Sequence, residues 1–371
     1  MTFEDFKLIP SLQETLLEQG FVTPTEIQNL TLQELLDGHS TVGLAETGTG
    51  KTLAYVLPVL HMLKTLENEG KSVTTESQPR AIVIVPSREL GEQVSKVFKI
   101  FTHATRLRIR SALGGTTFNM AKRNVAGCFE VLVATPKRTL QLFEHGLSLK
   151  DVHQIVFDEA DQMLDNSFLP TANRLVKACP PNPQMILFSA TISDVVQELM
   201  HKLFSEVTVF KSKGSHRLVS TLTTRNELIA RGNRFPVICD VLKEKVKGGI
   251  LIFTNTKTQC DELAAQLKEN KFECAVFHGD MDRLERRANL KKFRDGQIDI
   301  LISTDLGSRG LDFDNVNRVI NYNLPQEMEN YLHRAGRTAR AGRSGLVINF
   351  VTGRDRKLIE KVEHLNGKKD Q

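Results

Sequence analysis

Short apolar runs rich in valine and isoleucine recur along the chain, and most of them are followed by Gly, Pro, Ser, Thr or Asp. Near-continuous runs of this kind are typical of parallel strands whose two faces are both covered. In the first half they occupy residues 41–44, 81–85, 131–134, 155–157 and 185–188. In the second half they occupy residues 250–253, 274–277, 298–302, 319–322 and 346–351.

Helix-forming segments separate these runs, at residues 53–63, 89–101, 258–269 and 283–294. Strands and helices that alternate in this way predict α/β domains with parallel sheets and helices on both faces. The pattern occurs twice, so we expect two doubly wound domains in tandem, at residues 1–210 and 220–371. The polar, basic segment between them, residues 211–219, is the predicted linker.

The composition is that of a globular protein from a reducing compartment. Of its 371 residues, 40% are hydrophobic and 25% are charged, which is far too apolar for a disordered chain. No apolar run approaches the ~18 residues of a membrane span, and residues 1–10 are amphipathic and acidic, unlike a signal peptide. The 5 cysteines form no C-x-x-C pair, which argues against a zinc ribbon or a disulfide scaffold. We therefore expect a cytoplasmic protein that does not cross a membrane.

The net charge of +5 is unevenly distributed. Residues 1–210 carry 19 Lys and Arg against 23 Asp and Glu, a net charge of −4. Residues 211–371 carry 30 against 21, a net charge of +9. Ordinary solvated surface accounts for such an imbalance, and so does unequal contact of the two halves with a polyanion.

The strongest local motif is AETGTGKT at residues 45–52, between a predicted strand and a predicted helix. It has the form of a phosphate loop, G-x-x-x-x-G-K-[ST], with Ala45 in place of the first glycine. In this pattern backbone N–H groups surround the phosphates, Lys51 reaches the β and γ oxygens, and Thr52 ligates Mg²⁺. The candidate nucleotide-binding residues are Thr47, Gly48, Thr49, Gly50, Lys51 and Thr52.

The acidic motif Asp158-Glu159-Ala160-Asp161 directly follows the predicted strand at 155–157. Carboxylates at the carboxyl end of a parallel strand lie where such sheets bind ligands. Asp158 is the candidate Mg²⁺ ligand, directly or through water, and Glu159 is the candidate base that orients the attacking water. A helix N-terminus is the alternative interpretation, and the phosphate loop about a hundred residues earlier argues against it.

These two motifs, in this order and spacing, resemble those of the DEAD-box family of ATP-dependent RNA helicases, and the resemblance extends over residues 3–352. It implies two RecA-like domains joined by a short linker, with ATP and Mg²⁺ as cofactors. It also implies RNA as the partner, bound as a single strand or short duplex largely independently of sequence. Catalysis would rest on Lys51, Asp158, Glu159 and two arginines of the second domain.

Upstream of the phosphate loop, residues 20–28 (GFVTPTEIQ) resemble the family's adenine-reading segment. The resemblance implies that Phe21 stacks on the base and that the Gln28 amide pairs with the adenine edge. Phe3 matches the isolated aromatic residue that supports this segment. Glu26 stands where the family usually has proline, which releases a fixed φ and adds a negative charge near the nucleotide.

Ser189-Ala190-Thr191 resembles the family's coupling motif, whose hydroxyls bond to the acidic motif and link hydrolysis to strand separation. The resemblance also assigns Asp161 and His333 to coupling. A helix N-cap is a second role for the Ser189 and Thr191 hydroxyls, and it is compatible with the first.

Three segments of the first domain resemble the family's RNA-contacting loops: PSREL at 86–90, GG at 114–115 and TPKR at 135–138. Hydroxyls, backbone amides and arginines position an RNA strand through its phosphates without reading its sequence. Lys137 replaces the usual glycine, which adds a cation and removes the freedom to adopt positive φ. With two positions of the second domain, the candidate RNA-binding residues are Pro86, Arg88, Gly115, Thr135, Arg138, Arg286 and Thr304.

The second domain carries the remaining motifs, STD at 303–305, RGLD at 309–312 and HRAGRTAR at 333–340. By resemblance Arg337 and Arg340 are arginine fingers, which stabilise charge on the transferred phosphoryl group and are worth roughly 10³–10⁵ in rate. Asp312 resembles the acidic residue that contacts the ATP ribose. Arg283 and Ala339 replace the family's usual glutamine and glycine. Without the first-domain motifs, a solvated basic face would explain these arginines equally well.

The function expected from this resemblance is ATP-driven closure of two domains on one RNA strand, which separates short duplexes or remodels RNA–protein complexes. Two alternatives stay open: an ATP-gated RNA clamp without productive unwinding, and a DNA helicase of the wider superfamily. The departures at Glu26, Lys137, Arg283 and Ala339 leave room for the clamp. We expect a monomer, and ribosome-assembly or RNA-decay proteins are compatible partners. The sequence does not identify the RNA.

Overall fold

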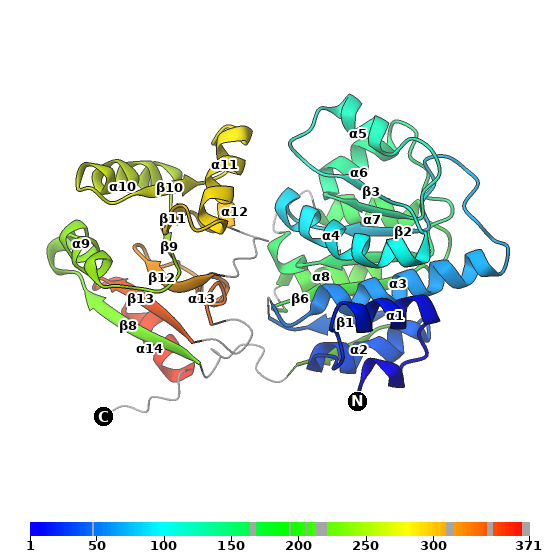
Figure 1. Cartoon of the computed structure of the whole chain (residues 1–371), viewed down its shortest axis with the longest axis horizontal. Coiled ribbons are helices and arrows are strands. Elements are labelled where there is room, and N and C mark those ends of the chain that lie inside the picture. Colours follow the sequence, from blue (N-terminus) through cyan, green and yellow to red (C-terminus); the bar gives the residue numbers. More distant parts are fainter. Residues whose placement is uncertain are drawn as a thin grey trace. The chain divides into compact units, whose positions relative to one another are not determined.

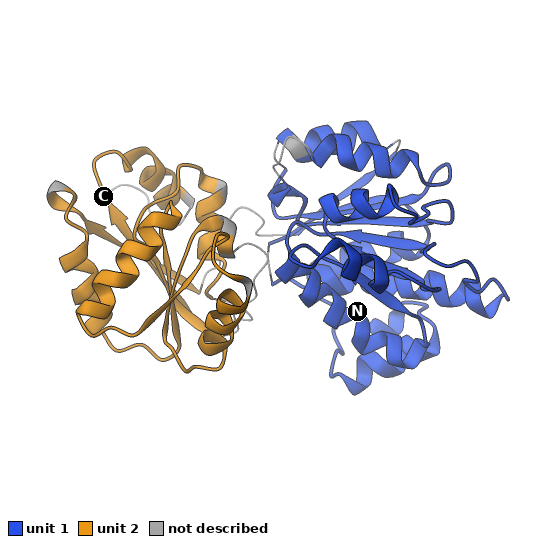
Figure 2. Cartoon of the chain, turned by 90° about the horizontal axis from the view of Figure 1, so that it is seen from above, with its two compact units in different colours: residues 1–215 blue, residues 216–371 orange. Residues whose placement is uncertain are grey.

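The computed structural model describes residues 1–46, 48–163, 168–192, 194–204, 206–212, 221–308, 315–339 and 344–365. The chain divides into two compact units, residues 1–215 and 216–371 (Figure 2). Each unit has its own parallel sheet with helices on both faces (Figure 1). The predicted fold class, two doubly wound α/β domains, is confirmed.

The sheet of the first unit has 7 parallel strands in the order β3-β4-β2-β5-β6-β1-β7. They are β1 (Thr41–Leu44), β2 (Ala81–Ile84), β3 (Ile109–Ala112), β4 (Val131–Ala134), β5 (Gln154–Asp158), β6 (Gln184–Ser189) and β7 (Thr208–Lys211). One face packs against α1 (Pro10–Glu18), α2 (Glu26–Leu36), α3 (Lys51–Asn68) and α4 (Arg88–Thr105). The other packs against α5 (Phe118–Asn124), α6 (Pro136–Phe143), α7 (Phe168–Lys177) and α8 (Asp194–Leu203). Short 3₁₀ helices lie at Phe3–Asp5 and Ala160–Gln162.

The sheet of the second unit has 6 parallel strands in the order β10-β11-β9-β12-β13-β8. They are β8 (Leu222–Leu228), β9 (Gly249–Phe253), β10 (Cys274–Phe277), β11 (Ile300–Ser303), β12 (Val316–Asn321) and β13 (Gly345–Val351). One face packs against α9 (Phe235–Lys243) and α10 (Lys257–Glu269). The other packs against α11 (Arg283–Arg294), α13 (Met328–Ala335) and α14 (Arg356–Leu365). The remaining elements are α12 (Asp305–Ser308) and a 3₁₀ helix at Ala230–Gly232.

Alternate residues of the central strands enter the cores on opposite faces of the sheet. In β2, Ala81 and Val83 belong to the core under α1–α4, whereas Ile82 and Ile84 belong to the core under α5–α8. This follows from the two-residue period of a strand. Since both faces are covered, most positions of such a strand are apolar, which is why the sequence pattern predicts it.

The sequence pattern missed β3, β7 and β8, and all three are edge strands. An edge strand is partly open to solvent, so polar side chains interrupt its apolar run; Arg110 and Thr208 are exposed examples. The predicted linker was wrong at its first residue, because Lys211 is the last residue of β7 and is paired with Leu44. Beyond Ser212, the rest of the predicted linker lies outside the described residues.

The cysteines are free, and Cys260 and Cys274 are buried in the core of the second unit. Burial raises the pKa of Cys179 to about 12 and that of Cys260 to about 11, so neither thiol is a reactive thiolate near neutral pH. In the described parts of the chain, no helix combines the length and apolar character needed to cross a bilayer.

Candidate active site

The phosphate loop connects the end of β1 to the start of α3. Gly50 adopts φ +90°, a left-handed conformation that favours glycine, and caps the helix. The Lys51 side chain is buried, and its Nζ donates to the Ala45 carbonyl at 2.8 Å. The first turn of α3 therefore holds the lysine against the loop that precedes it.

The other residues of the loop complete this turn. Gly48 has φ +84°, and the Thr49 hydroxyl donates to the Glu46 carbonyl at 2.7 Å. Thr52 is half-buried in the first turn of α3. Thr47, which the sequence also assigns to nucleotide binding, lies outside the described residues.

Gln28 joins the predicted adenine-reading segment to the phosphate loop, a contact that the sequence did not predict. Its Oε1 accepts from the Thr25 N–H at 2.8 Å, and its Nε2 donates to the Gly50 carbonyl at 2.9 Å. A Cβ on Gly50 would lie 2.5 Å from that Nε2, so the glycine permits the close approach. The side chain is 3% exposed, and its amide has one N–H and one oxygen lone pair left for an adenine edge.

Phe21 is an exposed aromatic side chain, 40% accessible, next to this segment. Phe3 is buried, and its backbone N–H donates to the Val22 carbonyl at 3.3 Å, which ties the N-terminal turn to the same segment. Glu26 is the exposed first residue of α2. Proline and acidic residues both suit the first turn of a helix, so this departure from the family leaves the local fold intact.

Asp158 is the last residue of β5 and is 2% exposed. The Tyr55 hydroxyl, from α3, donates to its Oδ2 at 2.8 Å, whereas its Oδ1 has no hydrogen-bond partner among the described residues. Burial and the negative charge of Glu159 raise the pKa of Asp158 from 3.8 to about 6, although Lys51 and Tyr55 favour the ionised form. The fold thus brings the helix of the phosphate loop to the acidic motif.

Glu159 adopts φ +51° and ψ +50°, a left-handed conformation that is strained for a residue with a side chain. Such a conformation costs on the order of 1–3 kcal/mol and recurs at functional sites. The Glu159 side chain is 6% exposed, and its Oε2 has no hydrogen-bond partner in the described part of the chain.

Buried carboxylate oxygens without partners are costly unless another group compensates their charge. Asp158 Oδ1 and Glu159 Oε2 therefore fit a hard divalent cation such as Mg²⁺. Within the described residues, no group of three or more His, Cys, Asp and Glu could hold a metal ion. A magnesium ion would thus take most ligands from phosphates and water, with Asp158 and Thr52 as the side chains that hold it.

Asp161 connects the acidic motif to the coupling motif after β6. Its Oδ2 accepts from the backbone N–H groups of Ala190 and Thr191, both at 3.1 Å, and from the Thr191 hydroxyl at 3.2 Å. The expectation was wrong for Ser189, whose hydroxyl donates to the Thr191 carbonyl at 2.8 Å because Ser189 is a fully buried strand residue. Neither hydroxyl caps α8, which begins at Asp194.

The loops after β2, β3 and β4 are joined by two arginines. Arg88 donates to the Gly114 carbonyl at 3.2 Å, and Arg138 donates to the Thr116 carbonyl at 2.6 Å. The three strands are neighbours and parallel, so their loops meet at one edge of the sheet. The predicted RNA-binding residues of this unit lie on them: Pro86 and Arg88 after β2, Gly115 after β3, Thr135 and Arg138 after β4.

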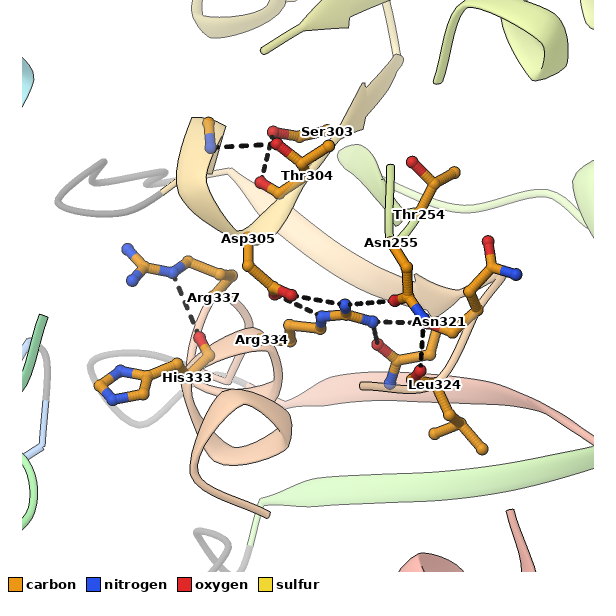
Figure 3. A network of polar contacts seen from close by, with 12 residues as sticks. Thr254, Asn255, Ser303, Thr304, Asp305, Asn321, Leu324, His333, Arg334 and Arg337 are labelled. Carbon is orange, nitrogen blue, oxygen red and sulfur yellow. Dashed lines mark hydrogen bonds and ion pairs between the residues drawn. The ribbon is translucent and has the colours of Figure 1, made fainter. Parts of the chain in front are cut away.

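Arg334 is the centre of a buried network in the second unit that the sequence did not predict (Figure 3). Its Nε and Nη2 donate to the Asp305 carboxylate at 2.6 and 2.7 Å. Its Nη2 and Nη1 also donate to the Asn255 and Asn321 side chains, at 3.0 and 3.1 Å, and Nη1 donates to the Asn323 carbonyl at 2.6 Å. The side chain is 1% exposed.

This network joins the ends of three adjacent strands, β11, β9 and β12. Each strand end supplies an acceptor: Asp305 beyond β11, Asn255 beyond β9 and Asn321 at the end of β12. Buried acceptors need donors, so Asn or Asp at the ends of several strands is the sequence signal that could have pointed to a buried arginine such as Arg334.

The predicted catalytic and coupling residues of the second unit lie close to this network. Arg337 is 3% exposed, and its Nε donates to the His333 carbonyl at 3.2 Å (Figure 3). Thr304 is buried, and its hydroxyl accepts from the Gly307 N–H at 3.2 Å. Two further predicted site residues, Asp312 and Arg340, lie outside the described residues.

The remaining departures from the family have different structural costs. Lys137 is the second residue of α6, so it does not need the conformational freedom of glycine. Ala339 is buried with φ +57°, a left-handed conformation that costs roughly 1–2 kcal/mol with a Cβ. Arg283 is the first residue of α11, and the guanidinium of Arg286 in the same helix lies 5.3 Å from the centre of the Phe277 ring.

Family models match both units: DEAD/DEAH box helicase at residues 25–199 and helicase conserved C-terminal domain at residues 233–342. The chain is 33% identical to ATP-dependent rRNA helicase RRP3 of Candida albicans, over 99% of this chain and 68% of that protein. It is 34% identical to DEAD-box ATP-dependent RNA helicase RhpA of Helicobacter pylori, over 95% of this chain and 70% of that protein. The structure of S. cerevisiae Dbp5 bound to RNA and ADP BeF3 is similar with a TM-score of 0.87 and 28% identity, covering 100% of this chain and 94% of that one.

Proposed function

Because the chain belongs to the DEAD-box family of ATP-dependent RNA helicases, enzymes that hydrolyse ATP, we propose that it separates short RNA duplexes or remodels RNA–protein complexes. One observation carries the proposal: the acidic motif contacts both the helix of the phosphate loop, through Asp158 and Tyr55, and the coupling motif, through Asp161 and Thr191. A change at the bound nucleotide can therefore be transmitted to the coupling motif through these hydrogen bonds.

The first unit supplies the nucleotide chemistry in this proposal. Lys51 neutralises the β and γ phosphates, and Asp158 and Thr52 hold the magnesium ion. Magnesium, when bound, offsets the charge that develops on the transferred phosphoryl group. Glu159 orients the attacking water and accepts its proton.

The second unit supplies arginines in place of a second phosphate loop. Arg337 and Arg340 stabilise the transferred phosphoryl group when the two units close on ATP. If RNA also binds both units, ATP and RNA favour the same closed arrangement, and each raises the affinity of the other. Closure that accepts one bent strand excludes a duplex, so short helices open locally.

RNA as the polyanion is supported by the names of the relatives and by the RNA-bound Dbp5 structure. The loops after β2, β3 and β4 would hold its phosphates through hydroxyls, amides and the two arginines. Such binding has little sequence preference and weakens steeply with salt. The rRNA helicase name of the Candida relative makes structured ribosomal RNA the first substrate to test.

Matched RNA and DNA single strands test the partner in a steady-state ATPase assay. RNA should stimulate hydrolysis and DNA should not, because only RNA offers the 2′-hydroxyl. Equal stimulation by DNA would favour the DNA-helicase alternative. A strand-displacement assay on a short RNA duplex, run beside it, separates unwinding from the clamp alternative. Hydrolysis without displacement would identify a clamp.

Glu159→Gln tests the catalytic assignment. Turnover should fall by about 10²–10⁴, the usual contribution of a general base, while ATP-dependent RNA binding persists. Glu198→Gln, an exposed change in α8, is the matched control and should leave both properties unchanged. Wild-type turnover in Glu159→Gln would remove Glu159 from the base role.

A further inference from the structure

Tyr55 is a buried polar residue to which the proposed function assigns no part in magnesium binding. It lies in α3, four residues after Lys51 and three after Thr52, so the three side chains share one side of the helix. Its side chain is completely buried, and its hydroxyl donates to Asp158 Oδ2 at 2.8 Å. A tyrosine in the phosphate-loop helix thus contacts the carboxylate that the acidic motif offers to magnesium.

This hydrogen bond distinguishes the two oxygens of Asp158. Oδ2 is engaged by Tyr55, and Oδ1 has no hydrogen-bond partner among the described residues. A carboxylate fixed through one oxygen cannot rotate freely, so Oδ1 is the atom left for a cation or its water. Partners of this kind orient metal ligands and influence metal affinity.

The Tyr55 ring is held in place by aromatic neighbours. Its centroid lies 5.7 Å from that of Phe188 and 6.4 Å from that of Phe98, both at tilted angles. Phe188 in turn fills the space beside Gly43, where a Cβ would come within 2.3 Å of its ring. The hydroxyl therefore has a fixed position relative to β5.

We propose that Tyr55 is a positioning residue that orients Asp158, with Oδ1 outward, to receive the magnesium ion of the bound nucleotide. The inference rests on the proposed role of Asp158 as a magnesium ligand. Removing the hydroxyl leaves Oδ2 buried without a partner and the carboxylate free to rotate, so magnesium binding weakens while nucleotide contacts to the phosphate loop remain.

The test is a titration of Mg²⁺ into full-length protein with a fluorescent ADP analogue, comparing the wild type with Tyr55→Phe. In EDTA the two proteins should bind the analogue equally. The half-point is the Mg²⁺ concentration that gives half of the increase in affinity for the ADP analogue. It should rise about tenfold or more in Y55F, the usual effect of removing a hydrogen-bond partner of a metal ligand. An unchanged half-point would overturn the proposal.

Tyr331→Phe is the matched control, because Tyr331 is also completely buried and its hydroxyl accepts from Asn349 at 3.1 Å, in the second unit. The Tyr331→Phe variant also loses a buried hydroxyl, but it should keep the wild-type Mg²⁺ response. If Y55F does not fold, Phe188→Leu replaces it: loss of the ring that packs against Tyr55 should shift the half-point in the same direction. A wild-type half-point in that variant would overturn the proposal.

Asp158→Asn separates this inference from the proposed function on which it rests. If D158N removes the Mg²⁺ response and Y55F does not change it, Asp158 is the ligand and the role of Tyr55 is wrong. If D158N leaves the response intact, both assignments are wrong. Loss of the response in D158N together with a weakened response in Y55F supports both.

Discussion

The charge on buried Asp158 lowers the stability of the folded protein. Burial and the charge of Glu159 place its pKa at about 6, above the ordinary value of 3.8. At neutral pH the folded protein therefore holds a charge that the unfolded chain carries more easily, at a cost of about 3 kcal/mol. The stability that protonated Asp158 contributes is complete below about pH 4 and is lost as the pH rises through about 6.

Asp158→Asn should therefore stabilise the first unit when nucleotide and magnesium are absent. Asparagine keeps an acceptor for Tyr55 and removes the charge, so the free energy of unfolding at pH 7.5 should rise by about 1–3 kcal/mol. At pH 4 the gain should largely disappear. Urea unfolding followed by circular dichroism at both pH values measures it, with Glu198→Gln as the exposed control. An equal gain at both pH values would contradict the charge explanation.

The sequence predicts site residues whose chemistry fixes both residue type and spacing. Lys51, Asp158 and Glu159 fall in this class, because phosphate and metal binding allow few alternatives. Tyr55 and Arg334 do not: in the sequence, one is a helix-core aromatic and the other is part of a basic surface. Their roles depend on hydrogen-bond acceptors that come from distant strands. Those contacts form only in the folded chain, where both side chains are buried.

At the scale of elements, local signals determined what was predictable. The helix predicted at 283–294 has those bounds in the structure, because Asp282 accepts from the N–H groups of Leu284 and Glu285 at its start. Central strands were predictable because both faces are covered. The edge strand β8 was not, since Thr223 and other residues along it are exposed. Contacts that join one strand to another, such as the Arg334 network, have no local signal in the sequence.

Arg334→Lys tests whether that network holds the ends of β9, β11 and β12 together. Lysine keeps the charge but has three N–H donors, whereas Arg334 makes five hydrogen bonds, so the second unit should lose about 2–4 kcal/mol of stability. Hydrogen exchange should rise in these strands and stay unchanged in the sheet of the first unit. Arg356→Lys, in an exposed ion pair with Glu360, is the control. Unchanged exchange in R334K would show that the network does not stabilise these strand ends.

At the scale of the whole molecule, the net charge of each unit agrees with the role proposed for that unit. By compact units the net charges are −2 and +7, since Lys211 and Lys213 belong to the first unit. The acidic motif and the phosphate loop occupy the nearly neutral unit, and Arg337 occupies the basic one. A polyanion that binds both units would be attracted mainly to the second, so its affinity should fall steeply with salt.

The proposed split of the site predicts reciprocal coupling between ATP and RNA. A non-hydrolysable ATP analogue should raise RNA affinity by about 5–150-fold, and RNA should raise the affinity of the analogue by the same factor. Arg337→Ala should reduce both factors equally and leave ADP binding unchanged, because ADP lacks the γ-phosphate that the arginine would contact. Fluorescence anisotropy of labelled RNA and labelled analogue measures the two factors independently, with Arg356→Ala as the control. Coupling that survives in R337A would place the connection between the two ligands elsewhere than at this arginine.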